Sequence, residues 1–210
     1  MTDNTSFRDL FSVTDDHAYF RHPAVGALPD RTAEVIQELV VDMNRNGCLN
    51  EKQWRRRIQE TRRNAAELIG TDTERIGFVS STSHGLSWLA ESLSLSSGDA
   101  VLVPDCEFPA NQFPWEHLKR RGVEFHTIET DGGTFTPEAI DRALDSSTEV
   151  LSLSSVEFHN GFRADLQAIG ELCRERDVVF VVDAIQSLGW DSIDVNQCGI
   201  DALVADGHKW

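Results

Sequence analysis

The chain has 210 residues, which is enough for one domain with a sizeable hydrophobic core. Its 35 acidic residues outnumber 19 basic ones and give a formal net charge of −16, which argues against nucleic acids and anionic membranes as partners. The sequence has no apolar run of membrane-spanning length, no signal-peptide pattern and no C-x-x-C spacing, so it predicts a cytoplasmic protein with reduced, mostly buried cysteines and no metal site.

Apolar periodicity predicts an alternation of helices and strands along the chain. Helices are expected from Asp30, from about Asn50 to Gly70, around Leu86, from about Ala110, from Pro137 and over residues 166–172. Short apolar runs predict strands at residues 76–79, 101–103, 123–128, 150–153, 178–182 and 200–205. Strands separated by helices of this length predict an α/β fold, with a mainly parallel sheet and helices on both faces.

Two polar groups stand at the ends of the last two predicted strands, where parallel sheets bind their ligands. The run 178–182 ends in Asp183, and the run 200–205 leads into Asp206-Gly207-His208-Lys209. A lysine amine can hold the aldehyde of pyridoxal phosphate as a Schiff base, and a carboxylate can keep the pyridine nitrogen protonated. The pair therefore indicates an enzyme that uses pyridoxal phosphate. Asp183 could instead cap the following helix, and Lys209 could be a solvated lysine near the chain end.

A serine-rich segment, Ser80-Ser81-Thr82-Ser83-His84-Gly85, follows the predicted strand 76–79 and opens a helix. Hydroxyl groups and free amides at a helix N-terminus form an anion site, although serine-rich caps are also common without a ligand. No G-x-G-x-x-G follows a strand and no P-loop motif occurs, so a dinucleotide or P-loop nucleotide site is not expected.

Together these motifs resemble the class V aminotransferase family of fold type I pyridoxal-phosphate enzymes, which includes cysteine desulfurases, kynureninases and isopenicillin-N-epimerase-like proteins. The resemblance runs from about Tyr19 to Trp210, and its most specific parts are Asp183-x-x-Gln186 and Gly207-His208-Lys209. Residues 19–29 look like the family's N-terminal stretch, which usually passes near the substrate.

The resemblance implies a role for each candidate site residue. Those expected at the phosphate are Thr82, Ser83, His84 and His208. Those expected at the rest of the cofactor are Phe108 stacked on the ring, Asn160 and Gln186 near the phenolic oxygen, Asp183 at the ring nitrogen and Lys209 as the Schiff-base and catalytic lysine. Phe108 could instead be a core residue, and Asn160 before Gly161 could simply form a turn.

Asp206 departs from the desulfurase pattern, in which a phosphate-binding serine usually stands two residues before the histidine. A carboxylate facing a phosphate is repulsive, so we expect Asp206 to point toward His208 or a backbone amide instead. The segment looks closer to the epimerase-like branch of the family.

The resemblance also implies a domain organisation. Residues 1–20 would form an N-terminal segment and residues 21–210 an incomplete large cofactor domain, with the small C-terminal domain absent. The full-length enzyme would be a homodimer acting on an amino acid or its derivative as an aminotransferase, desulfurase or epimerase-like enzyme. We expect the 210 residues alone to bind the cofactor weakly and to be inactive; the alternative is a non-catalytic truncated or interaction protein that retains part of the fold.

Overall fold

The computed structural model describes residues 7–209, so residues 1–6 of the predicted N-terminal segment and Trp210 lie outside the described part. Its centre is a five-stranded sheet in the order β2-β1-β3-β4-β5, and every neighbouring pair of strands is parallel. The strands are β1 (Ala100–Pro104), β2 (Glu124–Ile128), β3 (Thr148–Ser154), β4 (Val179–Asp183) and β5 (Ala202–Val204). The predicted parallel α/β sheet is therefore confirmed.

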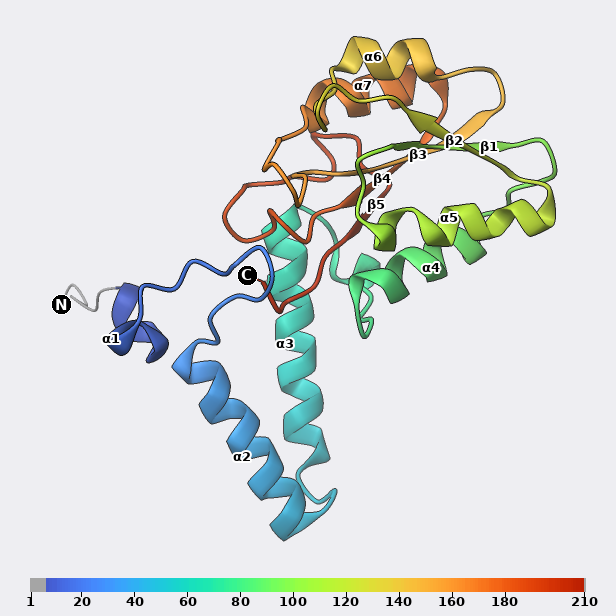
Figure 1. Ribbon diagram of the computed structural model, residues 1–210. Helices are drawn as coiled ribbons and strands as arrows, with labels where there is room; N and C mark the ends of the chain where they lie inside the picture. The colour runs from blue at the N-terminus through green and yellow to red at the C-terminus, as the bar shows by residue number, and fades with distance from the viewer. Residues whose placement is uncertain (1–6, 210) are drawn as a thin grey trace.

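Helices cover both faces of the sheet, as the sequence predicts (Figure 1). Short helices also occur at Phe7–Leu10, Val13–Asp16 (α1), Thr73–Arg75, Pro109–Asn111 and Leu118–Arg121. The longer ones are α2 (Asp30–Asn46), α3 (Glu51–Ile69), α4 (Thr82–Ser92), α5 (Phe113–His117), α6 (Pro137–Ala143) and α7 (Leu166–Arg176). Helices α6 and α7 lie on one face, and α4 and α5 lie on the other.

The alternation of side chains along each strand divides the core into two layers. Leu102 and Phe180 point into the layer under α6 and α7, whereas Val101 and Val181 point into the layer under α4 and α5. Both faces are buried because each is covered by helices, which explains why the strands read as continuous apolar runs. Trp115 anchors the second layer, where it is fully buried.

Helices α2 and α3 form a hairpin that projects away from the sheet (Figure 1). No described residue of α2 is buried, and the hairpin is tied together by Asp42, whose carboxylate accepts hydrogen bonds from Asn50 and from the Trp54 indole at 2.6 Å each. Asp30 begins α2, and its carboxylate accepts hydrogen bonds from the backbone amide and hydroxyl of Ser12. Among residues 7–209, no helix has the length and apolar character needed to cross a membrane.

The predicted strand at residues 76–79 is wrong, since this extended segment has no strand partner. It lines a groove of about 740 Å³ together with β5. An extended segment becomes a strand only when its backbone groups pair with a neighbour. The helix predicted from Ala110 is also interrupted, since a 3₁₀ turn at Pro109–Asn111 precedes α5 and a second one follows it.

Candidate functional site

The candidate residues gather at the carboxyl edge of the sheet, where β1, β3, β4 and β5 end. The register pairs Asp183, the last residue of β4, with Val204, the last residue of β5. Residues that follow β5 therefore start beside Asp183. The N-terminus of α4 and the loop after β1 approach the same edge, and they carry the candidate phosphate and ring residues.

Asp183 is an almost fully buried carboxylate, only 2% exposed. Its Oδ1 atom accepts a hydrogen bond from the Ile185 amide at 3.0 Å. Burial, helped by the charge of Glu107 and opposed by the Ile185 amide and the Lys209 amine, raises the pKa of Asp183 to about 7. A buried ionised carboxylate lowers the stability of the fold unless a cation lies nearby, so Asp183 is expected to have a cationic partner.

Lys209 supplies a cation at this position. Burial lowers the pKa of its amine from the ordinary value, and the negative charges of Asp183 and then Asp206 oppose that shift. The two residues predicted from separate strand ends are therefore brought within electrostatic reach of each other. A lowered amine pKa favours the neutral, nucleophilic form that bond formation with an aldehyde requires.

The N-terminus of α4 has the features of the predicted anion site. Ser81 caps it, and the Ser81 hydroxyl accepts a hydrogen bond from the His84 amide at 3.1 Å. Thr82 is buried, and its Oγ1 has no hydrogen-bond partner within residues 7–209, whereas Ser83 is exposed. A polar hydroxyl left without a partner at a helix N-terminus fits a bound phosphate oxygen.

The ring of His84 is held by its own helix. Its Nδ1 lies 2.9 Å from the Ser80 hydroxyl, and the ring packs edge-on against Trp88 with 4.3 Å between centroids. The contact of its side chain with a phosphate remains a prediction.

Asp206 engages His208, as expected from the sequence. Its Oδ1 accepts a hydrogen bond from the His208 amide at 3.3 Å and lies 3.0 Å from the Nδ1 atom of the same residue. The carboxylate thus has a cationic partner whenever the imidazole is protonated. Whether His208 also contacts the phosphate remains a prediction.

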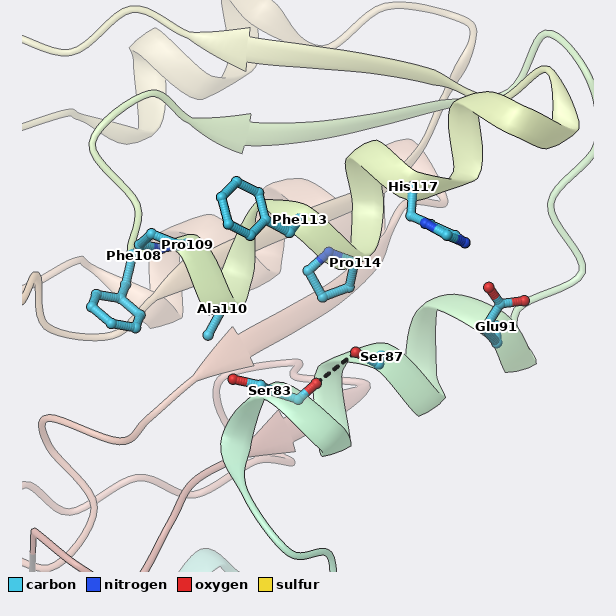
Figure 2. A pocket seen from close by; sticks show the side chains of 9 residues that line it. All are labelled: Ser83, Ser87, Glu91, Phe108, Pro109, Ala110, Phe113, Pro114 and His117. Carbon is cyan, nitrogen blue, oxygen red and sulfur yellow. Dashed lines mark hydrogen bonds between the residues drawn. The ribbon is translucent and has the colours of Figure 1, made fainter.

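Phe108 follows β1 on the loop that ends in Pro109–Asn111. It is 48% exposed rather than a core residue, and its ring packs edge-on against Phe158 at 5.1 Å. Figure 2 shows Phe108 and Ser83 on opposite sides of an open pocket of about 470 Å³ between α4 and α5. A half-exposed aromatic ring opposite the anion site suits the predicted stacking role.

Gln186 and Asn160 were both predicted near the phenolic oxygen, and the structure places them differently. The Gln186 amide donates a hydrogen bond to the Pro23 carbonyl at 3.2 Å, so it meets the N-terminal stretch at the site. The Asn160 amide donates to the carbonyls of Gly132 and Gly133, and its carbonyl accepts from the Phe162 amide. Asn160 therefore closes two turns, and a role for it at the cofactor remains a prediction.

The N-terminal stretch 19–29 was expected near the substrate, and its backbone contacts the lysine segment directly. The Gly26 amide donates a hydrogen bond to the His208 carbonyl at 2.7 Å. A Cβ atom at Gly26 would lie 2.8 Å from the Lys209 carbonyl carbon and closer still to its oxygen. Gly26 was not singled out from the sequence, because nothing in its local pattern shows which backbone approaches it.

Replacing Gly26 with alanine should therefore displace the Lys209 segment. Overpacking against a backbone costs about 1–3 kcal/mol of unfolding free energy. We expect a loss of that size, together with reduced labelling of Lys209 by pyridoxal phosphate and borohydride. Gly77→Ala is the matched control, since nothing lies within 4 Å of a Cβ atom there. Equal labelling in the two variants would contradict the close approach.

The four cysteines are free thiols, and the expectation that most are buried is wrong: Cys173 is buried, Cys106 and Cys198 are partly buried, and Cys48 is exposed. Burial raises the pKa of the Cys106 thiol, which lies next to the site, to about 12. A thiol with so high a pKa is a poor nucleophile at neutral pH. Among residues 7–209, no group of three or more His, Cys, Asp or Glu side chains is placed to hold a metal ion.

These features define a parallel α/β cofactor domain in which a buried acid and a lysine meet at the ends of adjacent strands, next to a helix N-terminus suited to phosphate. The chain belongs to the class V aminotransferase family, whose sequence profile matches residues 18–210. The family match supports pyridoxal phosphate as the group for which this site is built.

Curated relatives agree with the family assignment. The chain is 32% identical over 155 residues to a probable cysteine desulfurase of Methanothermobacter thermautotrophicus, covering 73% of this chain and 39% of the relative. It is 30% identical over 201 residues to the cysteine desulfurase IscS of Tolumonas auensis, and the match covers 91% of this chain and 50% of the relative. It is 27% identical over 207 residues to the uncharacterized aminotransferase YcbU of Bacillus subtilis, and the match covers 97% of this chain and 54% of the relative. The chain thus spans about 40–55% of the length of these relatives.

Solved structures show the same fold. A mutant of C-DES with glycine covalently linked to its PLP cofactor superimposes with a TM-score of 0.91 at 23% identity, covering 98% of this chain and 56% of that one. The cystine C-S lyase C-DES in complex with cysteine persulfide gives a TM-score of 0.88 at 23% identity, and the superposition covers 95% of this chain and 55% of that one. At this level of identity the likeness supports the architecture rather than a shared reaction.

Proposed function

We propose that this protein is a pyridoxal-phosphate-dependent enzyme that acts on an amino acid or its derivative. One observation carries the proposal: a buried carboxyl group, Asp183, ends β4, and a partly buried amine, Lys209, follows the adjacent parallel strand β5 closely enough for each to influence the other's pKa. An acid and an amine in this relation match the two protein groups that pyridoxal phosphate requires.

Each residue of the site has a distinct task in this proposal. When bound, pyridoxal phosphate supplies an electron sink for the substrate's α-carbon. With the cofactor bound, the Asp183 carboxylate would keep the ring nitrogen protonated, and the Lys209 amine would hold the cofactor and serve as the acid–base group for the α-proton of the substrate. The N-terminus of α4, with Thr82 and Ser83, and His208 would hold the phosphate, and Phe108 would cover the ring.

The reaction type is open among transamination, desulfuration and epimerisation. The names of the Methanothermobacter and Tolumonas relatives favour desulfuration, whereas the name of the Bacillus relative favours amino transfer. The raised pKa of Cys106 argues against this thiol as a sulfur acceptor. A desulfurase would then use an acceptor other than Cys106.

A panel of amino acids decides among these reactions. The full-length protein is loaded with pyridoxal phosphate and mixed with each L-amino acid, and three products are followed: sulfide after reduction, 2-oxo acids, and the D-isomer by chiral chromatography. The proposed function predicts one of these products with at least one substrate. A non-catalytic protein, the alternative, predicts none of them together with absent or unproductive cofactor binding.

We also propose that the whole protein is a cytoplasmic homodimer. Support for a partner comes from α2, where Ile36, Val40 and Met43 share one helix face and are 51%, 61% and 60% exposed. Apolar side chains at this spacing form a stripe that a second surface can bury. Light scattering of the purified protein tests the proposal, and a monomer at micromolar concentration would contradict it.

A further inference from the structure

Three carboxyl groups are buried together at the carboxyl edge of the sheet, and the proposed function uses only one of them. Beside Asp183 lie Glu107, on the loop after β1, and Glu157, on the loop after β3; they are 3% and 1% exposed. Two further acids in such a place are costly unless their charges are compensated.

Glu107 fastens the Phe108 loop to the end of β3. Its Oε1 accepts a hydrogen bond from the Ser154 amide, and its Oε2 accepts one from the Ser154 hydroxyl at 2.7 Å. Phe108 is the next residue, and its carbonyl accepts a hydrogen bond from the Asn111 amide at 2.8 Å. The position of the candidate stacking ring therefore depends on the carboxyl group of Glu107.

Glu157 has no such donors. Within residues 7–209 neither of its carboxyl oxygens receives a hydrogen bond from an N–H or hydroxyl group. The side chains whose contacts lower its pKa are the Glu107 carboxyl and the Cys106 thiol. Two carboxyl groups in this relation satisfy each other when a single proton lies between them, because one then donates and the other accepts.

We propose that Glu107 and Glu157 share one proton and form a positioning pair that fixes the Phe108 loop against β3. The pair does not touch the reacting atoms; it acts through Phe108. Its effect on the cofactor rests on the proposed function, whereas the shared proton itself is a property of the protein alone.

The surrounding charges favour retention of this proton at neutral pH. Burial and then the charge of Glu157 raise the pKa of Glu107 to about 8. Burial also raises the pKa of Glu157, helped by the charges of Asp183 and Asp105 and opposed by the contacts with Glu107 and Cys106. The nearby cation is Lys209, which acts on Asp183. Above about pH 8 the pair loses its proton and two carboxylates face each other.

The first test measures stability of the chain without cofactor. Both folded-state pKa values are raised, so the folded state holds more protons than the unfolded state between the ordinary carboxyl pKa and about pH 8. The folding equilibrium constant should therefore fall as pH rises through this window, by up to about tenfold per pH unit for each retained proton. Glu157→Gln removes one acid and the charge that raises the pKa of the other.

The folding equilibrium constant should fall between pH 6 and pH 8 in both proteins. We expect the fold-decrease to be at least about ten times larger in the wild type than in Glu157→Gln. Glu149→Gln, an exposed site on β3, is the matched control and should keep the wild-type slope. Glu107→Gln removes the same shared proton and serves if Glu157→Gln does not fold. Equal slopes in the wild type and the tested variant would overturn the proposal.

The second test measures positioning with pyridoxine 5′-phosphate, which lacks the aldehyde and therefore reports non-covalent binding. The affinity of the wild type should fall by about tenfold or more relative to Glu157→Gln between pH 7 and pH 9.5, and the ratio cancels the titration of the ligand. A ratio that stays constant with pH would overturn the positioning role. If neither protein binds the ligand, both the positioning role and the proposed cofactor fail, whereas the stability slopes still decide whether the proton is shared.

Discussion

Lys209→Ala should abolish the covalent attachment of pyridoxal phosphate. In the wild type, borohydride reduction should leave a phosphopyridoxyl group on Lys209, because this amine is partly buried, has a lowered pKa and lies beside Asp183. Peptide mapping by mass spectrometry gives a clear answer, since Lys52 and Lys119 are the other two lysines of the chain. Visible absorbance of the bound cofactor should disappear in the variant.

Lys52→Ala is the control for that experiment, because Lys52 is exposed on α3, away from the carboxyl edge of the sheet. Its labelling pattern at Lys209 should match the wild type. Modification of Lys52 or Lys119 with an unmodified Lys209 would contradict the assignment of the cofactor lysine.

Asp183→Asn should remove most turnover while leaving most cofactor binding. The carboxylate holds the proton on the ring nitrogen, so its loss weakens the electron sink in the transition state. Loss of one preorganised electrostatic contact typically lowers turnover by about 100–1,000-fold. Cofactor affinity should change by less than about tenfold, because the α4 N-terminus, His208 and Lys209 remain.

Asp177→Asn provides the same chemical change at an exposed position. Asp177 adopts a left-handed conformation with φ of 57°, which asparagine also tolerates, so the variant should fold and turn over substrate normally. The measurement is steady-state turnover of the full-length protein with the substrate found in the amino-acid panel, alongside a cofactor titration. Near-normal turnover of Asp183→Asn would contradict the pairing with the ring nitrogen.

Much of the fold could be predicted because its strands are buried on both faces. Val101, Leu102 and Val103 form a continuous apolar run for this reason, and the helices between such runs require parallel pairing. The error at residues 76–79 has a physical cause as well. The pattern there gives apolar character, but it does not say whether a strand edge lies within hydrogen-bonding distance, and here the segment pairs with no strand.

The site was predictable to the extent that it follows strand ends. Asp183 directly follows one apolar run and Lys209 follows another within four residues, so their approach is expected from parallel topology. Glu107 and Glu157 also follow β1 and β3, but their contact depends on the path of two loops, which no periodicity describes. Gly26 could not be predicted, because a glycine is needed there only since the Lys209 backbone passes close to it in the folded chain.

The hydrogen bond between Gly26 and His208 bears on how the protein folds. It joins a residue near the start of the described chain to one near its end, so it closes a loop that contains the entire sheet. Closing so long a loop has a large entropic cost, which is offset only after β4 and β5 have paired. The lysine segment should therefore become ordered last, and slow hydrogen exchange at the Gly26 amide would mark the moment when the chain becomes competent to receive its cofactor.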